Sequence, residues 1–151
     1  DWKFLVYCKP SHMLVDMNTV SELPSELIPI RMTIGAGEIT AYAEMSGDFN
    51  PIHMDAEAAR SAGMNDVIAH GTLTLNLIWE SIERNLDLSN NPELTLDVRF
   101  KAPVYRGETV ETGSALQPGK SAYDVWVSNQ DGLRVIEGTL GITPTKQPQT
   151  K

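Results

Sequence analysis

The most apolar helical pattern in the chain runs over residues 71–86, Gly-Thr-Leu-Thr-Leu-Asn-Leu-Ile-Trp-Glu-Ser-Ile-Glu-Arg-Asn-Leu. Its large apolar residues recur at the spacing of one helix face and extend over most of the helix circumference. These residues are Leu73, Leu75, Leu77, Ile78, Trp79, Ile82 and Leu86. A helix that is apolar on most sides is enclosed by the rest of the fold. The pattern therefore predicts one long central helix, whose polar last turns reach solvent.

The residues that follow this helix alternate between apolar and polar side chains, as strands with one buried face do. Alternation is clear over residues 94–101 and 123–127, and residues 136–142 continue it. Pro118-Gly119 and residues 130–132, Gln-Asp-Gly, are typical of hairpin turns. Consecutive hairpin-linked strands form an antiparallel sheet. We therefore expect an α+β domain in which this sheet wraps around the central helix.

Three shorter elements are predicted upstream of the central helix. Residues 27–34 are apolar enough for a first strand, and Pro29 favours an edge position in the sheet. Residues 38–46 have apolar side chains at helical spacing. A further short helix is expected from Asp55, which can cap it, to Ala62.

Composition limits the classes of function. The chain has 151 residues, 41% of them hydrophobic, and a net charge of −8. An acidic chain of this kind is not a general nucleic-acid binder, which needs a basic face. No apolar run approaches the roughly 18 residues of a membrane span. Cys8 is the only cysteine, which excludes an intrachain disulfide and a thiolate metal site and favours a cytoplasmic location.

The expected domain boundaries leave both ends outside the fold. Residues 1–16 are interpreted as a tag or a disordered N-terminus, because Ser11-His12-Met13 resembles a vector junction. Residues 17–143 form a single domain in this interpretation. Residues 144–151 contain proline and no apolar periodicity, so they are expected to be a loose C-terminal tail.

One short segment brings together polar side chains suited to proton transfer. Within residues 46–53, Ser-Gly-Asp-Phe-Asn-Pro-Ile-His, the candidates are Asp48, Asn50 and His53. A carboxylate, an imidazole and an amide are the groups needed to hold a water molecule and move its proton. The alternative interpretation is structural, because Asp and Asn are common in turns and a single His is more often structural than catalytic.

The order of these residues resembles that of the MaoC-like (R)-specific enoyl-CoA hydratases, also called hydratase 2, which have the hot dog fold. The similarity includes residues 46–53, then residues 68–71, Ile-Ala-His-Gly, which open the central helix. It continues in residues 98–107, Val-Arg-Phe-Lys-Ala-Pro-Val-Tyr-Arg-Gly, and covers the chain from Ile30 to about Ile142. The resemblance implies a single hot dog domain.

The resemblance also implies roles for four residues. Asp48 and His53 would be the catalytic dyad that holds the water, and Asn50 would help to position it. The backbone N–H of Gly71 would donate to the thioester carbonyl oxygen. A helix N-terminus suits that task because its free N–H groups and dipole stabilise developing negative charge. Which member of the dyad moves which proton stays open.

His70 is the competing histidine. We expect it to be structural, through a hydrogen bond that holds the loop entering the central helix. A metal site built from Asp48, His53 and His70 is the sharper alternative, since a carboxylate and two imidazoles are a legitimate ligand set. However, the sequence has no His-x₃-His or Glu-x-x-His spacing, and the resembled family uses no metal. We therefore expect no metal and no cofactor.

Three cations, Arg99, Lys101 and Arg106, lie within eight residues of this acidic chain. They are assigned to binding the phosphates of coenzyme A or of the phosphopantetheine arm of a carrier protein. An ordinary solvated strand face is the competing interpretation. Alternation places Arg99 and Lys101 on the same exposed face.

The implied function is reversible hydration of trans-2-enoyl thioesters to (R)-3-hydroxyacyl thioesters, or the reverse dehydration, by a hydro-lyase of fatty-acid metabolism or polyketide biosynthesis. Its partners would be acyl-CoA or an acyl-carrier-protein thioester and a second copy of the chain in a homodimer, with no nucleic acid and no membrane. Two alternatives stay open. One is a hot dog acyl thioesterase, and the other is a non-catalytic partner subunit of a heterodimeric dehydratase.

Overall fold

The computed structural model describes residues 2–8, 23–89 and 92–144. Segments of alternating apolar residues form the strands of one antiparallel sheet. In chain order the strands are β1 (Trp2–Cys8), β2 (Arg31–Thr33), β3 (Glu93–Phe100), β4 (Thr109–Leu116), β5 (Ala122–Asn129) and β6 (Arg134–Thr143). Their order across the sheet is β1-β3-β6-β5-β4-β2. Every neighbouring pair is antiparallel.

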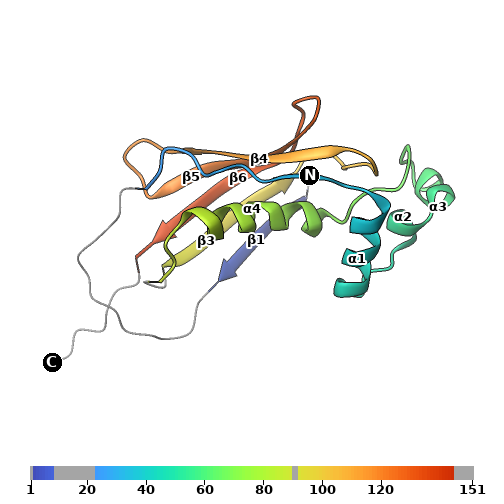
Figure 1. The fold of residues 1–151 in the computed structure, drawn as a ribbon, viewed down its shortest axis with the longest axis horizontal. Coiled ribbons are helices and arrows are strands. Elements are labelled where there is room, and N and C mark those ends of the chain that lie inside the picture. The colour runs from blue at the N-terminus through green and yellow to red at the C-terminus, as the bar shows by residue number, and fades with distance from the viewer. Residues whose placement is uncertain (1, 9–22, 90–91, 145–151) are drawn as a thin grey trace.

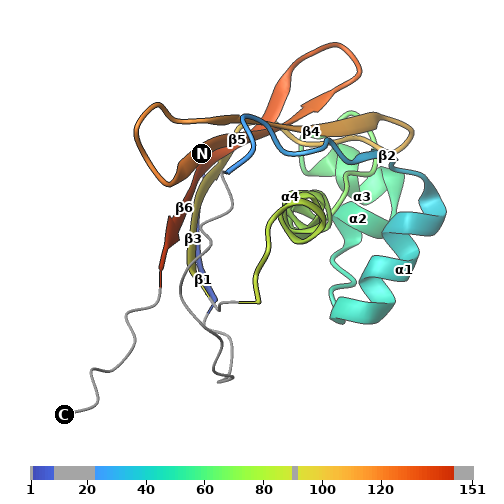
Figure 2. The ribbon, with the colours of Figure 1, turned by 60° about the vertical axis from the view of Figure 1, so that its left-hand side comes forward.

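Helix α4 (Gly71–Asn85) is the predicted central helix and lies along the concave face of the sheet (Figure 1). Figure 2 looks along α4 and shows the sheet curving around one side of it, with the shorter helices on the other. Ile78 and Ile82 of α4 are buried against inward-facing strand residues such as Leu96 and Leu140. The prediction of an antiparallel sheet wrapped around one long helix is confirmed.

The shorter helices are α1 (Ala36–Ser46), α2 (Pro51–Met54) and α3 (Ala56–Ser61), and they gather at one end of the sheet (Figure 1). The predicted helices at 38–46 and 55–62 correspond to α1 and α3. Asp55 caps α3 as expected, because its Oδ1 accepts hydrogen bonds of 2.8 Å from the N–H groups of Glu57 and Ala58. The four-residue α2 was not predicted, since residues 47–51 contain mainly turn-forming side chains.

The predicted first strand is much shorter than residues 27–34, although its edge position is confirmed. Only β2, Arg31–Thr33, pairs with β4. Residues before it are held partly by side chains of the sheet: Leu27 N–H donates to Ser114 Oγ at 2.7 Å, and Ile30 N–H donates to Thr112 Oγ1 at 2.8 Å. Residues 27–30 are therefore bound to side chains of β4 and do not form a regular strand.

Residues 1–16 were expected to be a tag or a disordered N-terminus, and the domain boundary at residue 17 stays a prediction. The structure pairs β1 with β3 along its whole length, from Trp2 opposite Phe100 to Cys8 opposite Leu94. The physical reason is that an edge strand presents unpaired backbone groups, and a neighbouring apolar segment without Pro or Gly can pair with them. Residues 9–16 and the tail from 145 lie outside the described residues.

Candidate active site

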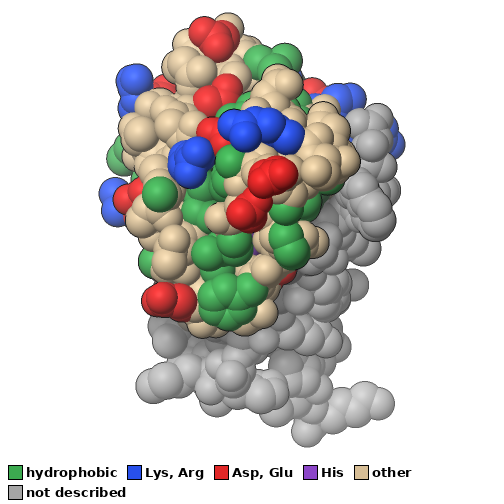
Figure 3. All heavy atoms as spheres, turned by 90° about the vertical axis from the view of Figure 1, so that its right-hand side faces the viewer, with side chains coloured by type: hydrophobic (Ala, Val, Ile, Leu, Met, Phe, Trp, Pro, Cys, Tyr) green, Lys and Arg blue, Asp and Glu red, His purple; other side chains and the backbone are tan. Residues whose placement is uncertain are grey.

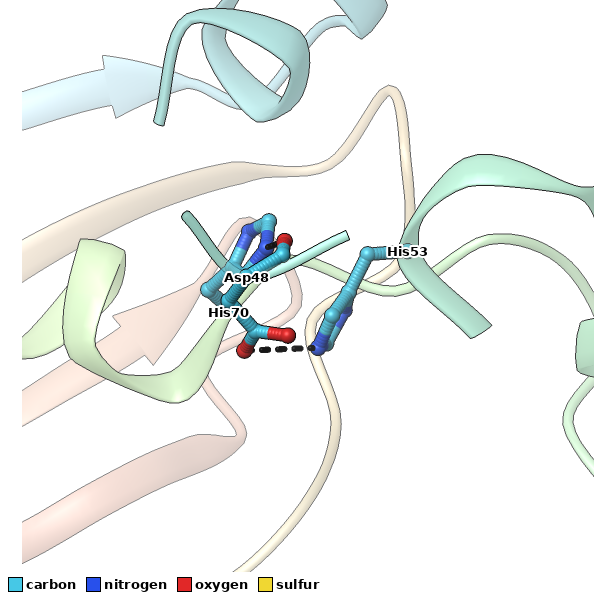
Figure 4. Close-up of side chains that lie close together, drawn as sticks. All are labelled: Asp48, His53 and His70. Carbon is cyan, nitrogen blue, oxygen red and sulfur yellow. Dashed lines mark hydrogen bonds and ion pairs between the residues drawn. The ribbon is translucent and has the colours of Figure 1, made fainter. Parts of the chain in front are cut away.

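The loop after α1 carries Asp48 to the open end of the sheet. Gly47 ends α1 in the left-handed conformation, with φ 74°, which glycine adopts without strain. Ser46 Oγ then accepts a hydrogen bond of 3.3 Å from Asp48 N–H, and Asp48 Oδ1 accepts one of 3.2 Å from Asn50 N–H. These turns leave the second carboxylate oxygen of Asp48 directed at His53 (Figure 4).

Asn50 begins α2 and is a capping residue. Its Oδ1 accepts a hydrogen bond of 3.2 Å from Ile52 N–H, and Pro51 occupies the first helical position, where its missing N–H costs nothing. The side-chain oxygen of Asn50 is thereby occupied by the backbone. Its expected role in positioning water stays a prediction, and the structure gives it the separate task of orienting the helix that holds His53.

His53 is buried and held in one tautomer. Its Nδ1–H donates to the carbonyl oxygen of Ile68 at 2.8 Å, so Nε2 carries the lone pair. Nε2 lies 4.0 Å from Asp48 Oδ2, too far for a direct hydrogen bond. The His53 side chain is 10% exposed and that of Asp48 is 54% exposed, so a water molecule can reach both groups from one side.

The pKa of His53 lies below its ordinary value. Burial is the largest cause, because it penalises the charged imidazole, and the neighbouring His70 lowers the pKa further. The hydrogen bond to Ile68 and the charge of Asp48 act in the opposite direction. His53 is therefore neutral at pH 7, with a free Nε2 that can accept a proton from water.

Gly71 is the first residue of α4 and lies beside the same cavity as His53. The first N–H groups of a helix have no acceptor inside the helix. A Cβ at Gly71 would come within 2.9 Å of the Phe100 ring, so glycine here also lets this aromatic side chain pack against the helix start. Glycine at position 71 is therefore also needed for the packing of Phe100, which the sequence did not indicate.

The cavity that contains His53 and Gly71 has a volume of about 290 Å³. Apolar side chains make up most of its wall, among them Met64, Phe100 and Ile136. A cavity of this size, apolar apart from a few polar groups at one place, is typical of a site for a small organic ligand.

On the end of the molecule formed by the short helices, hydrophobic side chains gather in a band, with Lys and Arg beside it (Figure 3).

The three cations assigned to carrier binding are not brought together. Lys101 lines the cavity of His53 and lies 3.5 Å from Glu137. Arg99 lines a different, polar hollow on the sheet, which includes Asp124. Arg106 Nη2 donates to both carboxylate oxygens of Asp66, at 3.0 and 3.1 Å. Arg99 lies opposite Glu137 across the β3–β6 pair, so Glu137 lies beside both Arg99 and Lys101, as a shared face requires. The assignment of these cations to carrier binding stays a prediction.

The three candidate metal ligands do lie close together. Asp48, His53 and His70 each offer an atom within 4.8 Å of the others. One nitrogen of each imidazole already donates to a carbonyl oxygen, Ile68 for His53 and Asp48 for His70, which leaves one nitrogen per ring. Proton transfer by Asp48 and His53 needs no metal. The absence of a metal from the reaction stays a prediction.

His70 was expected to hold the loop that enters the central helix. Its Nε2 donates to the carbonyl oxygen of Asp48 at 2.8 Å, so it joins that loop to the loop that carries the dyad carboxylate. Its ring stacks on that of His53 with centroids 3.9 Å apart. The His-Gly pair at the helix start was visible in the sequence, but this partner 22 residues away was not.

Several known proteins are similar in sequence to this chain. Residues 19–135 match the family described as MaoC like domain. The chain is 33% identical over 109 residues to a mitochondrial 3-hydroxyacyl-[acyl-carrier-protein] dehydratase of Arabidopsis thaliana, covering 67% of this chain and 64% of that protein. It is 34% identical over 76 residues to the (R)-specific enoyl-CoA hydratase of Aeromonas caviae, covering 50% and 57% respectively. The chain thus spans less than two thirds of the length of either relative.

Solved structures show the same fold. An unliganded (R)-hydratase of Pseudomonas aeruginosa superposes with a TM-score of 0.66 and 26% identity, over 83% of each chain. The predicted hot dog architecture is confirmed by this similarity. Within the described part of the chain, no helix combines the length and hydropathy that crossing a bilayer requires.

Proposed function

The chain belongs to the MaoC-like family, whose matching region spans residues 19–135, and from that membership we propose that it is a hydro-lyase acting on acyl thioesters. The reaction is addition of water to a trans-2-enoyl thioester to give an (R)-3-hydroxyacyl thioester, or the reverse dehydration. Relatives named as an acyl-carrier-protein dehydratase and an enoyl-CoA hydratase support this assignment.

One arrangement carries the proposal: the neutral imidazole of His53 and the first residue of α4, Gly71, line one apolar cavity, with Asp48 beside His53. A water held between Asp48 and His53 can lose a proton to this pair as its oxygen bonds to C3 of the enoyl group. C2 takes up a proton from the same pair, so that one H and one OH are added in all. The negative charge that develops on the thioester oxygen is stabilised by the N–H groups and dipole at the start of α4.

The decisive experiment follows the ultraviolet absorbance of 2-enoyl thioesters with acyl chains from C4 to C16, on coenzyme A and on a carrier protein. Loss of the absorbance without release of free thiol is expected. Thiol release would instead identify a thioesterase. Failure with every substrate, combined with activity after addition of a related subunit, would identify a non-catalytic partner.

Lys101 is the cation placed to contact the carrier. Lys101→Gln should raise KM about three- to tenfold and leave kcat nearly unchanged, because a phosphate contact far from the reacting carbons acts equally on ground and transition states. Initial rates at two ionic strengths measure this, since salt screens exposed charges. Arg31→Gln is the matched control, because Arg31 also pairs with a surface carboxylate, that of Glu111 at 3.8 Å, lines neither hollow and should change neither constant. Equal effects of the two substitutions would refute the assignment.

The proposal includes a homodimer and a cytoplasmic location. Three large apolar side chains at the site end, Met45, Phe49 and Met54, are 71%, 56% and 40% exposed, which supports a protein contact there. Sedimentation at a mass twice 16.6 kDa is expected, and a monomer at assay concentration would refute the dimer.

The presence of only one cysteine, Cys8, supports a reducing compartment.

A further inference from the structure

His70 contacts both members of the dyad although the proposed reaction gives it no task. Its Nε2 donates to the backbone carbonyl of Asp48 at 2.8 Å, while its ring stacks on His53 with an interplanar angle of 29° (Figure 4). On another side the Tyr42 ring lies against it, with centroids 5.1 Å apart. Only 2% of His70 is exposed, so these neighbours hold the imidazole in one orientation.

The hydrogen bonds of His70 define which ring nitrogen donates. Because Nε2 carries the hydrogen given to Asp48, a neutral ring has its lone pair on Nδ1. Nδ1 is buried and has no hydrogen-bond partner among the described residues. A hydrogen on Nδ1 would therefore lack an acceptor, whereas the hydrogen on Nε2 has one. The geometry thus favours a ring that donates from Nε2 to Asp48.

Asp48 has few other restraints. Its backbone N–H reaches Ser46 Oγ at 3.3 Å and its Oδ1 receives Asn50 N–H at 3.2 Å, both at the long end for hydrogen bonds. The 2.8 Å hydrogen bond from His70 is shorter than both, and its donor lies 22 residues further along the chain. It ties the exposed loop to His70, which directly precedes α4 and is itself buried.

We propose that His70 is a positioning residue of the hydration reaction, which fixes the Asp48 peptide by its Nε2–H bond and the His53 ring by stacking. This inference rests on the proposed function. A shift of about 1 Å between groups that must hold one water can cost on the order of 100-fold in rate. His70 thus sets the separation between the Asp48 carboxylate and His53 Nε2, and does not itself touch substrate.

Two substitutions separate this role from simple packing. The amide nitrogen of Gln reaches the position of imidazole Nε2, whereas that of Asn reaches only the position of Nδ1. His70→Asn should lower kcat about 30- to 100-fold with KM within a factor of two, because the loop loses its tether. His70→Gln should recover most of this loss and remain within about fivefold of wild type, since the donor to Asp48 is retained.

Ser81→Ala provides the matched control. Ser81 is a buried residue of α4, far from the dyad, and its hydroxyl donates to the Ile28 carbonyl at 2.8 Å. Like His70→Asn, the substitution removes a buried side-chain hydrogen bond to a backbone carbonyl. It should lower the melting temperature by a few degrees and leave kcat unchanged. Equal kcat for the Asn and Gln variants of His70, or a loss of kcat in Ser81→Ala as large as in His70→Asn, would overturn the inference.

A second measurement does not depend on activity. Nitrogen-15 NMR of the imidazoles in wild-type protein at pH 7 should report the Nε2–H tautomer for His70 and the Nδ1–H tautomer for His53. An Nδ1–H tautomer of His70, which has no hydrogen to give to Asp48 from Nε2, would overturn the positioning role even if the variants fail to fold. Wild-type protein that hydrates no enoyl thioester but shows these tautomers would refute the proposed function, and leave the described geometry intact.

Discussion

Asp48→Asn should lower kcat about 10²- to 10⁴-fold, the usual contribution of a general acid–base group. An amide is nearly the same size as the carboxylate but can neither accept a proton from water nor balance charge on His53. The loop should keep its shape because His70 bonds to the backbone carbonyl of Asp48, which the substitution leaves in place. Steady-state kinetics and a thermal melt of the same sample measure both effects.

Asp55→Asn is the matched control for that substitution. Asp55 caps α3 a few residues further along through Oδ1, which an Asn side chain can reproduce. Its kcat and melting temperature should both stay close to wild type. Asp48→Asn protein that keeps more than about half of the wild-type kcat would show that Asp48 is not a member of the dyad.

Gly138→Ala should destabilise the fold by about 3 kcal/mol, at the upper end for overpacking of a core. A Cβ at position 138 would lie 2.0 Å from the backbone oxygen of Asp97 and 2.7 Å from Val98 Cα. These are backbone atoms of β3, the strand paired with β6 at this point, so they cannot move aside as a flexible side chain can. Urea unfolding should show a lower midpoint with an unchanged slope.

Gly141→Ala tests the same substitution on the same strand without the clash. Its Cβ would meet Thr95 at 3.8 Å, an ordinary van der Waals distance, and neither glycine has a positive φ. Both substitutions reduce the freedom of the unfolded chain equally. We expect Gly141→Ala to change stability by no more than about 0.5 kcal/mol. Equal destabilisation by the two variants would show that close packing at Gly138 is not the cause.

The sequence pattern alone predicted those helices, strands and turns that depend on residues close together in the chain. The apolar stripe of residues 71–86 predicted α4, the alternation near Val98 and Val125 predicted β3 and β5, and Gly119 and Gly132 turn the chain with positive φ. Side-chain period and turn chemistry act over a few residues, so they can be recognised without the fold. The candidate residues Asp48 and His53 were likewise recognised from their order in the sequence, although the short helix α2 that carries His53 was not predicted.

Long-range contacts could not be predicted in this way. Alternation assigned Arg99 and Lys101 to one exposed face, but only the assembled sheet brings Glu137 of β6 opposite Arg99 and within 3.5 Å of Lys101. Pairing of residues 2–8 with β3 depends on an edge that exists only in the assembled sheet.

The chain by itself determined which groups are available for the chemistry: the carboxylate and imidazole of Asp48 and His53, and a glycine at the start of an enclosed helix. Only the tertiary structure decided how they act together. It buries His53 and so lowers its pKa, and it stacks His70 on His53 while bonding His70 to the Asp48 loop. Burial and stacking depend on what the folded chain brings alongside each residue, and sequence order does not contain that information.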